Sequence, residues 1–188
     1  MEESDFLVRL INKLETAKIP YMVTGSMASG LWGVPRTTND FDIVIQPTQD
    51  QFELFLNSFS EDYYISSDAA RDAYRKHTMF NIIDHKTGWK ADLIVLKNLP
   101  FQKEAFQRRR AGLIFGVKVR VTSPEDAILS KLVWAKSSDS ERQIRDASGV
   151  IEVQRENLDL DYLRKWAHEL GVEEMLEKII DEADKLKP

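Results

Sequence analysis

Two aspartates inside an apolar run constrain this chain more than any other feature. Asp40 and Asp42 are separated by Phe41 in the segment "DFDIVI". In a β-strand, residues i and i+2 share a face, so both carboxylates point the same way while Phe41, Ile43 and Ile45 fill the other face. Carboxylates this close repel each other unless a proton or a cation lies between them, and such oxygen ligands suit Mg²⁺ or Mn²⁺. The segment therefore predicts a strand with one apolar face and one acidic face that can bind a divalent cation.

A third acidic residue lies in a similar setting further along the chain. Asp92 is the one acid in the apolar run "ADLIVL". If that run pairs beside Asp40 and Asp42 in the sheet, the three carboxylates can hold two metal ions about 3.5–4 Å apart, an arrangement that supports in-line phosphoryl or nucleotidyl transfer. The alternative is that Asp40 ends a loop and Asp42 is a solvated edge residue, because an Asp-x-Asp pair is a short pattern.

The pair Gly25-Ser26 falls between a predicted strand and a predicted short helix. Such a junction offers free backbone N–H groups and the positive end of a helix dipole to an anion. Gly25 lets the backbone approach a phosphate closely, and the hydroxyl of Ser26 can donate a further hydrogen bond. Taken alone, the pair is equally a serine N-cap after a glycine turn. Arg36, in the bend before Asp40, is either a phosphate clamp or a loop charge.

Helical and strand patterns alternate in the first two thirds of the chain, and only helical patterns follow. The predictions include a helix with Ser4 as its N-cap over 4–18, a hairpin of 78–84 with 89–96, a helix over 100–110, and a small hairpin or bulged strand over 113–121. We therefore expect an α/β (α+β) fold with a mixed β-sheet flanked by helices. Residues 1–121 form the predicted catalytic domain, and residues 122–188 form a helical module packed against it.

Composition narrows the class of protein. The chain of 188 residues is 43% hydrophobic, carries a net charge of −5 and has no cysteine. It can therefore build a core, and it has neither disulfides nor thiolate metal sites. Acidic residues follow Met1, and no apolar run approaches the roughly 20 residues that cross a bilayer. We expect a cytoplasmic protein with no membrane partner, in which metal ions or a local cluster of Arg and Lys handle phosphates.

Taken together, "GS", "RTTNDFDIVI" and "KADLIVL" resemble the nucleotidyltransferase fold of the DNA polymerase beta type. The resemblance implies that Gly25 and Ser26 hold a nucleoside triphosphate. It implies that Asp40, Asp42 and Asp92 bind two Mg²⁺ (or Mn²⁺) ions. The implied reaction moves a nucleoside monophosphate from an NTP, such as ATP, to a hydroxyl acceptor and releases pyrophosphate.

Within that superfamily the chain looks like the AbiEii-type branch, which includes toxins of toxin–antitoxin systems. The Arg-x-Thr-x-Asp-x-Asp pattern of that branch matches Arg36 and Thr38 together with the two aspartates. A later helical motif resembles "KLVWAKSSDSERQIRDASGVI" and implies that four residues lie near the triphosphate: Lys131, Arg142, Arg145 and Asp146. The branch usually has another acid three residues after that last aspartate, where this chain has Gly149.

The residues themselves leave several functions open. Without the resemblance, Arg142 and Arg145 fit a salt-bridged helix surface, with Arg145 paired to Asp146 or Glu141. The acceptor can be tRNA, a protein or a small molecule. A catalytically inactive nucleotide- or partner-binding module of a toxin–antitoxin-type system is the alternative function, which the Gly149 departure motivates. A phosphohydrolase using the same acids is a third.

Overall fold

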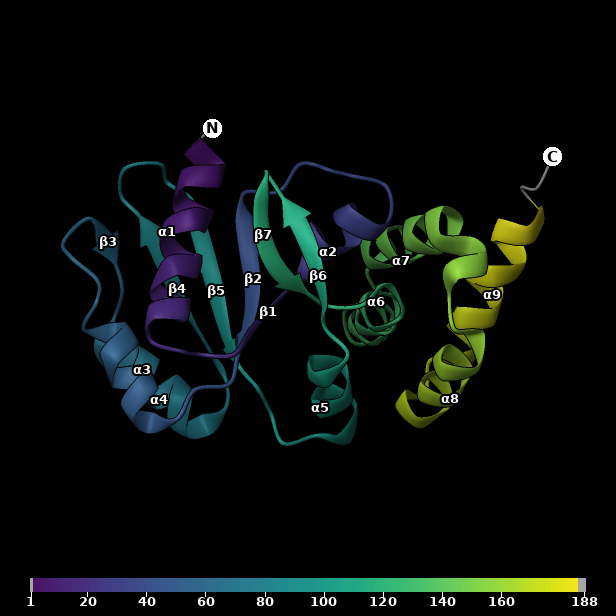
Figure 1. Cartoon of the computed structure of the whole chain (residues 1–188). Coiled ribbons are helices and arrows are strands. Elements are labelled where there is room, and N and C mark those ends of the chain that lie inside the picture. Colours follow the sequence, from purple (N-terminus) through teal and green to yellow (C-terminus); the bar gives the residue numbers. More distant parts are fainter. Residues whose placement is uncertain (1, 186–188) are drawn as a thin grey trace. The chain divides into compact units, whose positions relative to one another are not determined.

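The computed structural model (Figure 1) describes residues 2–185. The helices are α1 (Glu2–Thr16), α2 (Gly25–Trp32), α3 (Gln49–Leu56), α4 (Ser67–Lys76), α5 (Pro100–Gln107), α6 (Pro124–Ser138), α7 (Glu141–Gln154), the short 3₁₀ helix η1 (Arg155–Asn157), α8 (Leu160–Leu170) and α9 (Glu173–Lys185). The strands are β1 (Tyr21–Thr24), β2 (Asp40–Ile45), β3 (Tyr63–Tyr64), β4 (Met79–Asp84), β5 (Lys90–Val95), β6 (Arg110–Ile114) and β7 (Val117–Val121). The predicted mixed sheet with flanking helices, followed by helices alone, is confirmed.

The strands form one seven-stranded mixed sheet in the order β3-β4-β5-β2-β1-β7-β6. β2 lies inside the sheet, where it pairs antiparallel with β1 and parallel with β5. The predicted hairpin of 78–84 with 89–96 is confirmed as the antiparallel pair of β4 and β5. Because β5 pairs with β2 on its other side, the two strands that carry the predicted acids are neighbours.

One face of the sheet packs against α1, which lies in front of β4 and β5 in Figure 1. Phe41 of β2 is fully buried, and its ring centroid lies 6.0 Å from that of Phe6 in α1. Leu10 and Leu14 follow Phe6 at helical spacing and are also buried, so α1 presents a continuous apolar stripe to this face. The prediction that Ser4 is the N-cap is wrong, since α1 begins at Glu2 and already includes Ser4.

Two further boundaries differ from the sequence-based prediction. The helix expected over 100–110 ends at Gln107, because Arg110 already pairs with Val121 as the first residue of β6. The prediction for 113–121 was a small hairpin or a bulged strand, and the structure has a hairpin. The hairpin turns at Phe115 and Gly116, whose φ values are +49° and +79°. The two-residue strand β3 had no counterpart in the prediction.

The chain divides into two compact units. The first comprises the described residues up to Thr24 together with 38–121, and the second comprises 25–37 together with the described residues from Thr122 on. The segment of α2 belongs to the second unit because it packs on α6 and α7. Trp32 donates from Nε1 to the carbonyl of Thr122 at 2.7 Å and accepts at its own carbonyl from Gln154 at 2.6 Å. The domain division 1–121 and 122–188 stays a prediction.

The second unit is otherwise built from the helices α6 to α9. Its first long helix starts as the sequence predicts, with Ser123 as N-cap accepting from the backbone N–H of Asp126 and Pro124 in the first turn. The helix α8 ends at Gly171, which has a left-handed φ of +66°. Among residues 2–185, no helix combines the length and the apolar character that crossing a bilayer requires.

Candidate functional site

The pairing of β2 with β5 brings the three predicted acids to neighbouring positions on one sheet face. In the parallel register, the Cα of Asp42 is the partner of the Cα of Asp92, and the Cα of Asp40 is the partner of the Cα of Lys90. Paired residues on neighbouring strands share a face, and the strands lie about 4.8 Å apart. We call Asp40, Asp42 and Asp92 the acidic cluster. It lies wholly within the first unit.

The alternation of β2 explains why its acids lie outside the α1 core. Phe41, Ile43 and Ile45 are fully buried, whereas Asp40 and Asp42 are half-buried. The apolar residues fix the register, because a slip of one residue would move both carboxylates into the core. Asp92 is more enclosed, with 8% of its surface exposed. The alternative in which Asp42 is an edge residue does not hold, since β2 is an interior strand.

Lys90 places a positive charge among these carboxylates. Its Nζ donates to Oδ2 of Asp92 at 2.9 Å. The pKa of Lys90 is raised, first by this hydrogen bond and then by the charges of Asp92, Asp40 and Asp42, against the opposing effect of burial. Lys90 therefore shares the sheet face of all three acids and forms an ion pair with Asp92.

Two short polar side chains also donate hydrogen bonds to the acidic cluster. The amide of Asn81, on β4, donates to Oδ1 of Asp92, so both carboxylate oxygens of Asp92 accept hydrogen bonds. The hydroxyl of Thr38 donates to Oδ1 of Asp40. Thr38 lies in the bend before β2 and was predicted to bind nucleotide. Its observed partner is a carboxylate of the acidic cluster.

The chemistry of the acidic cluster fits a divalent cation. The donors are carboxylate oxygens, which Mg²⁺ and Mn²⁺ prefer, and the ammonium group of Lys90 already lies beside one of these carboxylates. Among the described residues, no group of three His, Cys, Asp or Glu side chains is arranged as a finished set of ligands. A metal ion that bound Asp92 would have to replace Lys90 or Asn81, which donate to its two carboxylate oxygens.

A second group of predicted residues comes together inside the second unit. Gly25 begins α2 with a φ of +64°, a left-handed conformation that glycine adopts without strain. Ser26 lies within α2, and its hydroxyl accepts a hydrogen bond from the guanidinium of Arg36. Arg36 also binds Asp146 through its Nε, at 3.2 Å. Arg36 therefore has partners on α2 and α7, and its role as a phosphate clamp stays a prediction.

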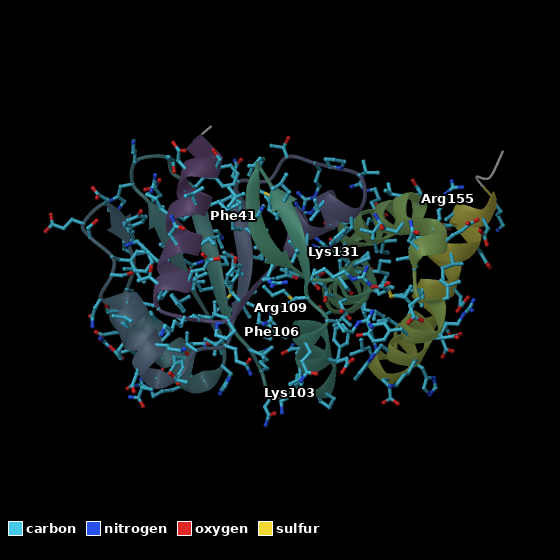
Figure 2. The ribbon with its side chains drawn as sticks, in the orientation of Figure 1. Phe41, Lys103, Phe106, Arg109, Lys131 and Arg155 are labelled. Carbon is cyan, nitrogen blue, oxygen red and sulfur yellow. The ribbon has the colours of Figure 1, made fainter. Side chains whose placement is uncertain are left out.

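Asp146 of α7 joins this group to α6. Its Oδ2 accepts from Nζ of Lys131 at 2.7 Å, and both side chains are almost completely buried, with 9% and 6% exposed. Figure 2 labels Lys131, which lies on α6 within the second unit. We call Gly25, Ser26, Arg36, Lys131 and Asp146 the Ser26 cluster. It combines a helix N-terminus, a hydroxyl and two cations that share one carboxylate, a combination suited to binding an anion.

The other two predicted cations do not join the Ser26 cluster. Arg142 and Arg145 lie on the exposed side of α7. The suggested pairing of Arg145 with Asp146 is not what the structure shows, because the partners of Asp146 are Arg36 and Lys131. A Cβ added at Gly149 would come within 3.3–3.4 Å of the side chain of Val34, so the position that is usually acidic in the AbiEii-type branch is here a packing contact.

Sequence reasoning missed three features of these clusters. It did not single out Lys90 or Asn81, and it did not assign Asp146 to Lys131 and Arg36. The signal for Lys90 was present, since Lys90 and Asp92 are two apart in a strand and therefore share a face. Asn81 and the pairs of Asp146 join elements far apart in the sequence and carry no local signal.

The fold of this chain is similar to that of solved nucleotidyltransferases. No protein-family model and no curated protein matches its sequence. The crystal structure of ANT(2'')-Ia in complex with adenylyl-2''-tobramycin is similar, with a TM-score of 0.61 and 13% identity over 90% of this chain and 98% of that one. The solution structure of the antibiotic-resistance factor ANT(2'')-Ia gives a TM-score of 0.57 and 16% identity, over 88% and 92%.

Proteins from other organisms share the same fold. A nucleotidyltransferase-like antigenic protein from Paracoccidioides brasiliensis has a TM-score of 0.53 and 20% identity, covering 90% of this chain and 88% of that one. TM1012 of Thermotoga maritima, described as a putative nucleotidyltransferase, has a TM-score of 0.51 and 21% identity, covering 77% and 91%. At these identities the likeness establishes the fold.

Proposed function

We propose that this protein is a metal-dependent nucleotidyltransferase that moves a nucleoside monophosphate from an NTP to a hydroxyl acceptor. The observation that carries the proposal is the register of β2 and β5, in which Asp42 and Asp92 are direct partners and Asp40 shares their face. Three carboxylates whose charges act on one ammonium group are a costly arrangement for stability alone, because like charges repel. The nucleotidyltransferase fold of the similar structures supports the same reaction class.

The acidic cluster supplies the groups that this reaction needs. The acceptor oxygen forms a bond to the α-phosphorus, and the bond from that phosphorus to the bridging oxygen of the β-phosphate breaks. Pyrophosphate leaves with the electron pair. Asp92 accepts the proton of the hydroxyl, while Asp40 and Asp42 hold the divalent cations together with Asp92. Mg²⁺ or Mn²⁺, when bound, neutralises charge on the attacking and leaving oxygens.

The Ser26 cluster is assigned to the triphosphate. Gly25 and Ser26 offer backbone N–H groups and a hydroxyl, and Arg36 offers a guanidinium already held beside that hydroxyl. Lys131 contributes a buried positive charge. We also assign a role in nucleotide binding to Thr38, Arg142 and Arg145. Exposed cations such as the two arginines can offset phosphate charge that the acidic cluster repels.

A small molecule with a free hydroxyl is the acceptor class to test first. The complex of ANT(2'')-Ia contains tobramycin with an adenylyl group attached. The net charge of this chain is −5, which favours a cationic acceptor over a polyanionic one. Transfer RNA and proteins are the remaining acceptor classes. The AbiEii-type branch and a cytoplasmic location belong to the same proposal.

The experiment is incubation with each of four α-³²P-labelled NTPs and Mg²⁺, in the presence of aminoglycosides, total RNA or cell lysate. We expect label in one acceptor pool and release of pyrophosphate. The variant Asp42→Asn should lose at least about 100-fold in turnover, because it removes a carboxylate ligand. Asp181→Asn, which makes the same change at an exposed position on α9, is the matched control. Equal turnover of Asp42→Asn and the wild type would refute the assignment.

A second candidate function is a nucleotide- or partner-binding module without catalysis, of a toxin–antitoxin type. The packing of Gly149 against Val34 motivates it, because a side chain at this position would press on Val34. Measurable NTP binding with no incorporation into any pool would favour this function. Release of inorganic phosphate without an acceptor would instead indicate a phosphohydrolase.

A further inference from the structure

We infer that Lys90 is a built-in counter-cation of the acidic cluster, which a divalent cation must displace before the cluster can act. This inference rests on the proposed function, since it concerns the same three carboxylates. Lys90 is thereby a positioning residue that sets how tightly the cluster binds metal. It also holds the carboxylates together when no metal is bound.

The position of Lys90 follows from the strand register. It precedes Asp92 by two residues on β5 and is the cross-strand partner of Asp40 on β2, so it shares the face of all three acids. Its Nζ lies 2.9 Å from Oδ2 of Asp92. An ammonium group beside Asp92 reduces the repulsion between the carboxylates, as a bound divalent cation would.

Lys90 and Asn81 together occupy both oxygens of Asp92, but they differ in how easily they leave. The side chain of Lys90 is 37% exposed and has a flexible four-carbon stem, so its ammonium can move into solvent. Asn81 is short and lies on β4, directly opposite Asp92 in the antiparallel register. A metal ion that binds Oδ2 therefore displaces Lys90, while Asn81 continues to orient the carboxylate through Oδ1.

Two measurable effects would distinguish a counter-cation from a lysine with a purely structural role at position 90. Removing the ammonium should strengthen metal binding, because the metal no longer competes with a tethered cation. It should also destabilise the metal-free protein, because the repulsion between the carboxylates is then no longer offset by the ammonium of Lys90. Added metal should reverse that loss of stability. A lysine that only packed its stem would give neither stronger metal binding nor a rescue by metal.

The experiment compares Lys90→Met with the wild type in the absence of nucleotide. Mn²⁺ binding is measured by electron paramagnetic resonance of the free ion, and the melting temperature is recorded with and without Mn²⁺. Lys86→Met removes the same charge from an exposed position in the turn between β4 and β5 and is the matched control. Lys90→Arg keeps the charge and tests rescue by a conservative change.

We expect Lys90→Met to bind Mn²⁺ about three- to tenfold more tightly than the wild type, the effect of losing one partly exposed ion pair. Mn²⁺ should raise its melting temperature more than that of the wild type, and both control variants should resemble the wild type. Unchanged or weaker Mn²⁺ binding by Lys90→Met would overturn the inference. If the wild type and Asp42→Asn bind Mn²⁺ equally, the proposed function itself fails.

Discussion

At the scale of single residues, the carboxylate of Asp146 forms ion pairs with two cations at once. Its carboxylate binds Lys131 on α6 and Arg36 in the segment after α2. A buried ion pair is costly to form, but removing one partner is costlier, because it leaves an uncompensated charge. Asp146 therefore pairs with the buried ammonium of Lys131 inside the second unit and holds Arg36 beside Ser26.

The variant Asp146→Asn tests this role of Asp146. We expect the free energy of unfolding to fall by about 2–4 kcal/mol, because the ammonium of Lys131 would lose its carboxylate while only 6% of its side chain is exposed. Urea denaturation followed by circular dichroism measures the change. The control is Asp181→Asn on the exposed side of α9, which should change stability by less than about 0.5 kcal/mol. Equal stability of the two variants would contradict the role of Asp146.

Asp40, Asp42 and Asp92 show which features of the acidic cluster can be predicted from the sequence alone. The spacing of Asp40 and Asp42 sufficed to place them on one face, because strand periodicity is local. Their proximity to Asp92 needed the adjacency of β2 and β5, which are separated by β3 and β4 in the sequence. The partners of Asp146 could not be predicted, since helix packing rather than sequence distance decides them.

At the scale of helices and strands, the close contact between α2 and α7 depends on glycines, which have no side chain. A Cβ at Gly33 would lie 2.6 Å from the backbone nitrogen of Val150 and 2.7 Å from the carbonyl carbon of Gly149. Backbone atoms of a helix cannot move away cheaply, so only glycine allows this approach. The packing of α2 on α7 in turn sets where Ser26 lies relative to Asp146, so the geometry of the Ser26 cluster depends on these two glycines.

We expect Gly33→Ala to destabilise the protein by about 2–3 kcal/mol, because the added methyl group overlaps the backbone of α7. Gly30→Ala is the matched control, because Gly30 lies in α2 just before Gly33. The nearest atom to its added Cβ is 3.6 Å away, and alanine favours a helix over glycine, so its stability should stay equal or rise by up to about 1 kcal/mol. Chemical denaturation of both variants measures the difference. Similar effects at the two positions would argue against the close approach.

The pair of His168 on α8 and Glu173 on α9 gives a pH-dependent contact between elements. Nδ1 of His168 lies 3.1 Å from a carboxylate oxygen of Glu173, and the pKa of His168 is raised, first by this hydrogen bond and then by the charge of Glu173. The contribution of the pair to stability is fully present below the ordinary pKa of histidine. It is lost as the pH rises through the raised pKa of the folded state.

A nuclear magnetic resonance titration of the imidazole signals tests this contact. We expect His168 to titrate at a higher pH than a histidine in a model peptide, and Glu173→Gln should return its pKa toward the ordinary value. Glu174→Gln removes the same charge from the neighbouring residue and serves as control. If Glu173→Gln leaves the titration of His168 unchanged, the pair does not form in solution.

At the scale of the whole chain, the sequence predicts features that local patterns determine, but not those that tertiary contacts determine. Alternation and helical periodicity predicted most helices and strands, as well as the absence of strands after Val121 in the described chain. Boundaries failed where tertiary pairing overrides local preference: Arg110 leaves the helical pattern because β6 pairs with β7. In Figure 2, Phe106 and Arg109 lie together there, with the guanidinium 4.2 Å from the ring centroid. The grouping of 25–37 with the later helices had no sequence signal either.

The central claim is that Asp40, Asp42 and Asp92 bind divalent cations. The most direct measurement is the number of Mn²⁺ ions bound per chain in the presence of a non-hydrolysable ATP analogue, for the wild type, Asp42→Asn and Asp92→Asn. We expect two ions in the wild type and fewer than one in either variant, with circular dichroism showing that all three proteins are folded. Two ions bound with unchanged affinity in both folded variants would contradict the claim.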